Sequence, residues 1–554
     1  MRFALANRLT HLKTLLNKSY LVGFGCLLVE HEGAVNHEKN SPRKNARRLL
    51  ELAGALVLLS EYLAMLRIVV IASLVLLVAF SLLGWTAQAA PQANAIPKGQ
   101  IVERMECLND SSQSYALYLP SNYTPDRKWP ILYALDPGAR GKTPVERFKE
   151  AAEKYGWIVA GSNNSRNGPW LRAADAWSAM TKDTLQRFSI DDDRVYATGF
   201  SGGARMALQF AQLCQDCLAG VIACGAGFPG GLVPSTAMHF LFFGTTGTYD
   251  FNFSELRGLD DPLTKAGIIH RIDVFDGRHE WPPIAVATAA IEWMELHAMK
   301  SGKRPRDDAF IDATWQQSVK QAGTLEESKK YYEAYQIYLD LSESFKGLRD
   351  VNEVQKKASQ LGDSREVKDA IREEQQQIRK QREIDAQLQP LIGTLPRNGD
   401  DGSGREDTRS SAVVSADEEA MNRQNRLQAL LSQLRKQSNA GEDSSARRVA
   451  RRVLDGVFIS LFEQESSFLQ AEKHYREAIT TLKLATEINP DRPGSFFYLA
   501  WAYAASGDKK KSLQALSTAI DKGFSDLSAL GNNKAFDPIR NDPQYQQIVG
   551  KLKK

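Results

Sequence analysis

The pentapeptide Gly199-Phe-Ser-Gly-Gly203 constrains the fold of this chain more than any other sequence feature. It follows an apolar run, Arg194–Thr198, that is typical of a buried strand, and a run with helical apolar spacing begins at Ala204. Gly-x-Ser-x-Gly between a strand and a helix is typical of a nucleophile elbow, a tight turn that lifts a serine hydroxyl above the sheet. The sequence therefore predicts Ser201 as a nucleophile and the Gly202 N–H as an oxyanion donor, with a plain glycine-rich turn as the alternative.

Short apolar runs alternate with helix-period runs between residues 105 and 300. Strands are expected at 115–119, 130–135, 157–160, 195–198, 218–223, 240–243 and 271–275. Helices are expected at 145–154, 174–188, 204–213 and 283–298. This alternation predicts an α/β fold of the α/β-hydrolase kind, with a doubly wound, mostly parallel sheet covered on both faces. Because the connections leave no room for a large lid, we expect an open site.

A serine hydroxyl needs a base to take its proton, and in α/β-hydrolases the chain order is serine, acid, histidine. Between Ser201 and residue 300, the histidines are His239, His270, His279 and His297. The first two precede expected strands, and the last lies in an expected helix. His279 lies in a loop directly after a strand, at the edge of a parallel sheet where active sites collect. We therefore predict that His279 is the base, with a structural loop histidine as the alternative.

The acid is expected in the loop after the preceding strand, 240–243. Asp250 is the carboxylate best placed there, and it would hold the imidazole in the productive tautomer. Asp260, Asp261 and Asp276 are competing candidates for the acid. The alternative for Asp250 is a purely structural role in a turn.

A second oxyanion donor is expected from the loop after the strand at 130–135. This loop, Asp136–Gly141, is short and has small residues, so its backbone can approach a substrate closely. We predict that the N–H of Gly138 or Ala139 is this donor. Residues expected to line the substrate pocket are Asn163, Asn164, Trp170 and Trp281. Loop capping is the alternative role for Asn163, Asn164 and Trp170.

Several of these segments resemble the small bacterial esterases grouped with polyhydroxybutyrate depolymerases and feruloyl esterases. The matching stretches are Tyr115–Tyr123, the Asp136-Pro-Gly loop, Gly199–Gly203 and Gly277-Arg-His-Glu-Trp-Pro282. The resemblance implies a triad of Ser201, Asp250 and His279 that needs no cofactor or metal. Two departures stand out: Asp136-Pro-Gly138 replaces the family's usual His-Gly at the oxyanion loop, and Gly277-Arg-His279 replaces Gly-Gly-His.

The N-terminal part of the chain departs from soluble composition at Ile68–Trp85, an uncharged apolar run. Arg67 precedes this run and Ala87-Gln-Ala89 comes after it, which is the pattern of a signal peptide; an uncleaved membrane anchor is the alternative. We expect residues 65–90 to be that signal or anchor, and 1–64 to be a doubtful leader upstream of a start at Met65. The chain from residue 91 onwards is expected to be exported to the periplasm or anchored facing it.

Four cysteines lie beyond this leader: Cys107, Cys214, Cys217 and Cys224. In an oxidising compartment they allow up to two disulfides. Cys214-x-x-Cys217 has no second pair at metal-ligand spacing, so we expect a structural role and no metal site.

The chain from about residue 310 onwards is expected to be all helical, with tetratricopeptide-like repeats. A helical region is expected at 310–390, with one repeat-like hairpin at 331–348, then a disordered linker at 395–420 and repeats at 445–554. Small and apolar residues recur thirty-four positions apart: Ala478, Leu482 and Ala485 match Ser512, Leu516 and Ala519. Phe496 and Ala500 replace the tryptophan and glycine of the full signature, and a bundle without repeat ancestry is the alternative.

These features together favour an exported serine carboxylesterase that acts through an acyl-enzyme on short-chain or polymer-linked esters. A serine peptidase with the same triad is an alternative, and so is an interaction protein whose hydrolase domain is a degenerate platform. The repeats predict an unknown protein partner. The formal charge of +4 over 554 residues gives no reason to expect nucleic-acid binding.

Overall fold

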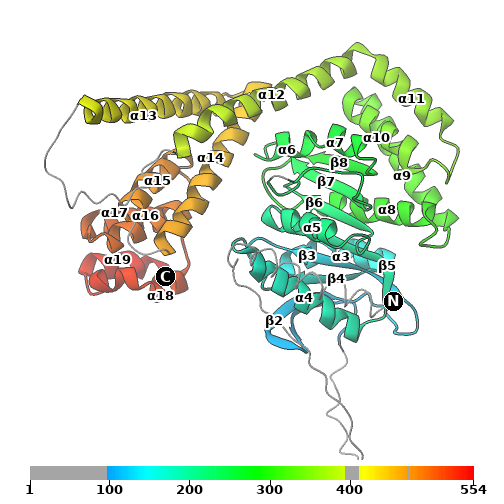
Figure 1. Cartoon of the computed structure of the whole chain (residues 1–554), viewed down its shortest axis with the longest axis horizontal. Coiled ribbons are helices and arrows are strands. Elements are labelled where there is room, and N and C mark those ends of the chain that lie inside the picture. Colours follow the sequence, from blue (N-terminus) through cyan, green and yellow to red (C-terminus); the bar gives the residue numbers. More distant parts are fainter. Residues whose placement is uncertain (1–95, 231, 394–410, 471–474, 554) are drawn as a thin grey trace, which may run out of the picture. The chain divides into compact units, whose positions relative to one another are not determined.

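The computed structural model describes residues 96–230, 232–393, 411–470 and 475–553 (Figure 1). The expected leader and the expected signal or anchor segment, residues 1–90, lie outside the described residues, as does most of the expected linker. Within the described ranges, no helix combines the length and the apolar character needed to span a membrane.

An eight-stranded sheet forms the centre of the α/β domain, with the strand order β1-β2-β4-β3-β5-β6-β7-β8. The strands are β1 (Ile101–Cys107), β2 (Asp110–Tyr118), β3 (Trp129–Leu135), β4 (Ile158–Ser162), β5 (Ile190–Phe200), β6 (Gly220–Cys224), β7 (Leu241–Gly247) and β8 (His270–Phe275). β2 pairs antiparallel with β1 and β4, and the pairs from β4 across to β8 are parallel. Every expected strand overlaps an observed one, and the mostly parallel sheet is confirmed.

β1 is the strand that the sequence did not predict. It lies at the sheet edge and pairs only with β2 among the described strands. Glu103, Arg104 and Glu106 are exposed along it, so the apolar signal of a buried strand is weak there.

Helices cover both faces of the sheet. They are α3 (Lys142–Tyr155), α4 (Trp170–Arg187), α5 (Gly202–Leu213) and α8 (Ile284–Lys300), with the short α6 (Phe253–Arg257) and α7 (Asp260–Lys265) between β7 and β8. Successive strand residues point to opposite faces, and in β3 Leu132 packs in the cluster formed with α3 and α8. Its neighbour Tyr133 packs edge-on against Trp177 of α4, whose ring stacks on Phe210 of α5. The domain is therefore doubly wound, and it fits the α/β-hydrolase fold.

The chain beyond the hydrolase domain consists of helices in the described ranges, as expected (Figure 1). They are α9 (Asp308–Glu327), α10 (Tyr331–Ser344), α11 (Asn352–Asp363), α12 (Arg365–Gly393), α13 (Ser411–Ser438), α14 (Ser445–Gln470), α15 (Tyr475–Ile488), α16 (Pro493–Ala505), α17 (Lys509–Asp521), α18 (Leu527–Asn532) and α19 (Pro543–Gly550), with 3-10 turns at Lys534–Ile539 and Lys551–Lys553. The expected linker at 395–420 is corrected at its C-terminal end, because α13 begins at Ser411.

The residues that recur at thirty-four positions are fully buried in the structure. Ala478, Leu482 and Ala485 lie in α15, and their counterparts Ser512, Leu516 and Ala519 lie in α17. α16 packs against both helices. Equivalent helices thus bury equivalent faces, and the tetratricopeptide assignment stays a prediction.

The first helices of this region share a core with the hydrolase domain. Leu296 and Met299 of α8 pack in one cluster with residues of α9, α10 and α11, including Tyr338 and Phe345. Arg257 of α6 forms an ion pair with Glu374 of α12 at 2.8 Å. The helical region is therefore packed directly against the α/β domain.

Candidate active site

Ser201 lies at the turn between β5 and α5 with φ 54° and ψ −121°. A non-glycine residue with positive φ is strained by about 1–3 kcal/mol, and such strain clusters at functional sites. The flanking glycines have a steric reason: a Cβ on Gly199 would lie 2.2 Å from the Gly203 carbonyl, and one on Gly203 would lie 2.1 Å from the Leu135 oxygen. The Ser201 N–H donates to the Cys224 oxygen at 2.8 Å, which ties the turn to β6. This is the geometry of a nucleophile elbow.

The structure brings the predicted base and acid together. His279, after β8, and Asp250, after β7, form a hydrogen bond of 2.9 Å between Nδ1 and Oδ1. An Nδ1–H donated to the carboxylate leaves Nε2 as the lone-pair nitrogen, which is the tautomer that a general base needs. Asp250 is fully buried, and this burial raises its pKa while the hydrogen bond from His279 lowers it. The Asn252 N–H also donates to Asp250 Oδ1 at 2.8 Å.

Two phenylalanine rings hold the imidazole of His279. The ring of Phe200, the residue before Ser201, lies 4.5 Å from it between centroids, and the ring of Phe251 lies 4.1 Å from it. The histidine is thus packed directly against the strand end that bears the serine. Its side chain is 13% exposed, so the base is shielded from bulk water on most sides.

The competing residues have other partners. His239 pairs with Asp216, and His270 pairs with Asp260, each at 3.2 Å. His297 is buried in α8, where desolvation lowers its pKa to about 3. None of these three histidines lies at the carboxyl edge of the sheet beside the elbow.

The expected second oxyanion donors are corrected by the geometry of the loop after β3. The Gly138 N–H donates to Asp136 Oδ1 at 2.8 Å, and the Ala139 N–H donates to the Asp136 backbone oxygen at 3.0 Å. Asp136 is fully buried, and its carboxylate also accepts from Arg140 Nε at 2.9 Å. Since this buried carboxylate organises its own loop, neither amide is available to an oxyanion in this structure.

Three expected pocket residues are also corrected. Trp281 is buried and donates through Nε1 to Asp136 Oδ2 at 3.0 Å, so it supports the oxyanion-side loop from beneath. Asn163 and Asn164 tie their loop to neighbouring strands: Nδ2 of Asn163 donates to the Glu103 oxygen of β1, and Oδ1 of Asn164 accepts from the Ser114 N–H of β2. Neither asparagine is among the residues that line the two cavities described below.

The role of Trp170 in a substrate pocket stays a prediction. It lines a second cavity of about 280 Å³ that adjoins Gly202 and Pro137. It lies at the start of α4, where its ring packs against Phe210.

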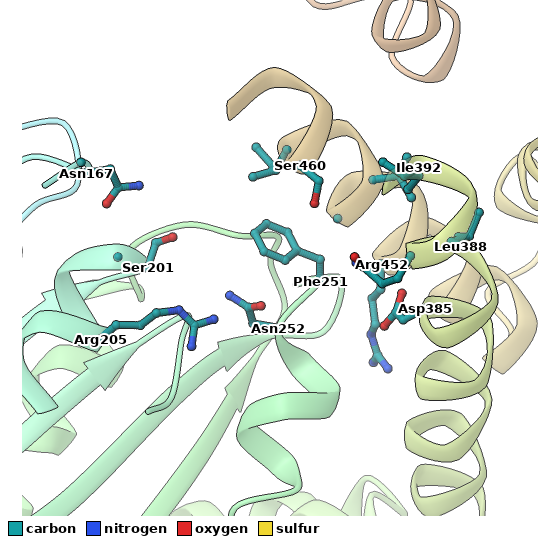
Figure 2. A pocket seen from close by; sticks show the side chains of 16 residues that line it. Asn167, Ser201, Arg205, Phe251, Asn252, Asp385, Leu388, Ile392, Arg452 and Ser460 are labelled. Carbon is teal, nitrogen blue, oxygen red and sulfur yellow. The ribbon is translucent and has the colours of Figure 1, made fainter. Parts of the chain in front are cut away.

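Asn167 is a site residue that sequence reasoning missed. Its side chain lies against the elbow, because a Cβ built on Gly202 would come 1.9 Å from Asn167 Oδ1. It lines both cavities, and Figure 2 shows it beside Ser201. The sequence pointed to the loop after β4, but to its first two asparagines, and no spacing rule distinguishes the three.

A cavity of about 520 Å³ opens beside Ser201 (Figure 2). Phe251 and Asn252 from the loop after β7 form one side, and the opposite wall comes from α12 and α14, with Leu388 and Val457 among its residues. The expectation of an open site stays a prediction, and what the sequence did not predict is the wall opposite Ser201. The wall comes from helices far along the chain, where insertions between strands could not reveal it.

Three charged side chains line this cavity: Arg205, Asp385 and Arg452. Arg205 forms a two-pronged ion pair with Glu255, at 2.7 and 2.8 Å. Burial raises the pKa of Asp385 on α12 to about 6. The cavity thus has a lining of mixed polarity.

The cysteines take structural positions. Cys214 and Cys217 form a disulfide, while Cys107 and Cys224 are free and buried. Burial raises the pKa of the Cys224 thiol to about 11, so it is a poor nucleophile near neutral pH. In the part of the chain that the structure describes, no group of three histidine, cysteine or carboxylate side chains could hold a metal ion.

No protein-family model matches this sequence, and no curated protein matches it. The structure is similar to S-formylglutathione hydrolase from Staphylococcus aureus, with 15% identity and a TM-score of 0.30 over 36% of this chain and 98% of that one. It is also similar to a ferulic acid esterase, at 16% identity and a TM-score of 0.30 over 35% of this chain and 94% of that one. Esterase 2 of Thermogutta terrifontis matches at 15% identity and a TM-score of 0.29, over 38% of this chain and 96% of that one. The assignment of the fold rests on the strand order and the elbow described above.

Proposed function

We propose that this protein is a serine hydrolase that cleaves carboxylic esters through an acyl-enzyme. The observation that carries the proposal is the 2.9 Å hydrogen bond between His279 and Asp250, beside a serine held at positive φ on a strand-to-helix turn. A buried carboxylate bonded to Nδ1 of an imidazole serves a base whose other nitrogen acts on the substrate. The three side chains come from three separate loops at one edge of the sheet, as this chemistry requires.

In the proposed reaction, Ser201 Oγ bonds to the ester carbonyl carbon while its proton passes to His279. The tetrahedral intermediate collapses when the bond to the alcohol oxygen breaks, and the alcohol leaves with the proton from His279. Water then attacks the acyl-enzyme by the same route and releases the acid. Asp250 steadies the imidazolium in both steps.

Gly202 and Asn167 are our candidates for the groups that stabilise the oxyanion. The Gly202 amide begins α5, so it lies at the positive end of a helix next to the nucleophile. The Asn167 side chain lies against Gly202, next to the nucleophile. A side-chain amide is an effective oxyanion donor in serine hydrolases.

The size of the cavity supports esters of modest size as substrates. A volume of about 520 Å³ lies within the range of about 300–1,000 Å³ that is usual for small-ligand sites. Short-chain esters, or single ester groups that protrude from a polymer, fit such a cavity.

The proposal includes export to the periplasm or anchoring that faces it. Its support is the predicted signal or anchor at 68–85, and the Cys214–Cys217 disulfide suits an oxidising compartment. It also includes a protein partner for the C-terminal repeats, which rests on the thirty-four-residue recurrence alone.

Hydrolysis of p-nitrophenyl acetate and butyrate by the purified protein tests this function. We expect turnover that falls to background in Ser201→Ala and in His279→Ala, with folding checked by circular dichroism. Hydrolysis that survives both substitutions would contradict the proposal, and so would an inactive wild type.

A further inference from the structure

We infer that helices α12 and α14 are part of the active site itself. They form the wall opposite Ser201 and set the length of the ester's hydrocarbon chain that the cavity accepts. This inference rests on the proposed esterase function. It assigns the C-terminal region a role within the catalytic centre, in addition to any partner binding.

The wall is made by a few side chains at helical spacing on two helices. Leu388 and Ile392 of α12 line the cavity one turn apart, and Gly456, Val457 and Ser460 of α14 line it beside them. Figure 2 shows Leu388, Ile392 and Ser460 across the cavity from Ser201. The apolar side chains of this wall, Leu388, Ile392 and Val457, suit the hydrocarbon chain of an ester, and polar side chains such as Gln389 lie among them.

Both helices form hydrogen bonds to the loop that bears Asp250. These bonds fix the distance between the wall and the nucleophile elbow. On α14, Arg452 Nε donates to the Thr248 oxygen at 2.7 Å, and its guanidinium lies 3.5 Å above the ring of Phe253. On α12, Gln381 Nε2 donates to the Phe251 oxygen at 2.6 Å. The two helices therefore hold the acid loop on both sides of Asp250.

The burial of Arg452 depends on the contact between α14 and the loop that bears Asp250. Arg452 is 1% exposed, and its Nη1 has no hydrogen-bond partner among the described residues. A buried guanidinium is costly unless its surroundings compensate. Here the compensation comes from the Thr248 oxygen and the Phe253 face, both on the hydrolase domain. Burial lowers the pKa of Arg452 to about 9, in keeping with a charge held away from water.

The wall is also linked to His279, the proposed base, through the side chain of Phe251. A Cβ on Gly456 would lie 3.2 Å from the Cβ of Phe251, so α14 passes this loop at close range. The ring of Phe251 in turn packs on His279 at 4.1 Å. A shift of α14 along this loop would therefore displace Phe251 and, with it, His279.

A matched pair of leucines tests the inference. Leu388 and Leu434 are both 1% exposed and belong to the same hydrophobic cluster, but only Leu388 lines the cavity. In the full-length protein, Leu388→Ala is expected to raise the ratio of kcat/KM for p-nitrophenyl octanoate over butyrate about tenfold, because the cavity deepens. Leu434→Ala is expected to lower Tm by a similar amount and to leave that ratio unchanged.

A second variant keeps the test decisive if Leu388→Ala fails to fold. Ser460 is partly exposed, so Ser460→Leu fills the cavity at little risk to the core. It is expected to lower the octanoate-to-butyrate ratio about tenfold while hydrolysis of the acetate ester falls less. Opposite changes of the octanoate-to-butyrate ratio in the two variants would identify the wall as the determinant of the accepted chain length.

The outcomes separate the two proposals. An active wild type whose ratio stays the same in Leu388→Ala and Ser460→Leu overturns this inference and leaves the esterase function standing. Equal changes of the ratio in Leu388→Ala and Leu434→Ala overturn it as well, because the effect would then be general loosening. A wild type that hydrolyses no ester overturns the proposed function and this inference together.

Discussion

The Nδ1 of His279 lies 2.9 Å from Oδ1 of Asp250, and the two residues come directly after the adjacent parallel strands β8 and β7. Because neighbouring parallel strands end at the same edge of a sheet, two loops distant in sequence meet there. The elbow after β5 lies at this edge too, and the Phe200 ring connects it to the imidazole. The sheet thus brings the three predicted triad residues into one neighbourhood.

Replacing Asp250 with asparagine tests its role as the orienting acid. Asp250→Asn keeps the shape but favours the other imidazole tautomer, so we expect kcat to fall about 10³–10⁴-fold with little change in KM. Steady-state kinetics on p-nitrophenyl butyrate measure the effect. Asp276→Asn is the control, since this competing carboxylate lies in the same region of the chain. Equal effects of the two substitutions would contradict the assignment.

Asn167 should matter to the transition state more than to substrate binding. We expect Asn167→Ala to lower kcat about 10²–10³-fold, because the oxyanion would lose one donor. The matched control is Asn164→Ala in the same loop, whose side chain bonds to Ser112 and Ser114 instead of facing the cavity. A fall of less than about threefold in Asn167→Ala would remove this residue from the oxyanion site.

The elbow glycines make a prediction about stability. Gly203→Ala places a Cβ 2.1 Å from the Leu135 oxygen, so we expect the free energy of unfolding to fall by about 2–4 kcal/mol. Gly323→Ala in α9 meets no atom within 4 Å and should raise it by about 0.5–1 kcal/mol. Urea denaturation measures both values. A neutral Gly203→Ala would show that the turn is looser than the structure has it.

His297 should make the stability depend on pH. Burial lowers its pKa to about 3, whereas the unfolded chain binds the proton near pH 6.5. The unfolded state therefore binds more protons below that pH, so this contribution is fully present above about pH 6.5 and is lost as the pH falls towards 3. Between pH 7 and pH 5 the loss is about 2 kcal/mol.

Two histidine variants measure this contribution. His297→Phe should flatten the dependence of unfolding free energy on pH between 7 and 5, because no proton is then taken up at this site on unfolding. The exposed His239 gives the control variant His239→Gln, which should keep the wild-type slope. A wild-type slope in His297→Phe would show that His297 does not carry this pH dependence.

Much of the hydrolase fold could be predicted because its signals are local. Apolar runs of strand length, helix-period runs and a Gly-x-Ser-x-Gly between them lie within short windows of sequence. His279 and Asp250 could be singled out from their places after expected strands and from the chain order serine, acid, histidine. β1 was missed because an edge strand exposes Glu103 and Arg104 and so lacks the signal.

The parts that could not be predicted depend on contacts between distant residues. The N–H groups of Gly138 and Ala139 are taken by Asp136, whose burial becomes visible only when Trp281 packs against it. The wall at Leu388 arises because the loop after β7 is held by α12 and α14. The apolar periodicity within each of these segments does not indicate which distant segment it contacts.

Labelling with a fluorophosphonate tests the central claim most directly, because this reagent needs a serine activated by a base at an oxyanion site. We predict one adduct per chain, located by peptide mass spectrometry on the peptide that contains Ser201, and lost in Ser201→Ala. We also predict that labelling slows at least about a hundredfold in His279→Ala. An unlabelled, folded wild type, or an adduct that persists in Ser201→Ala, would contradict the assignment of Ser201 as an activated nucleophile.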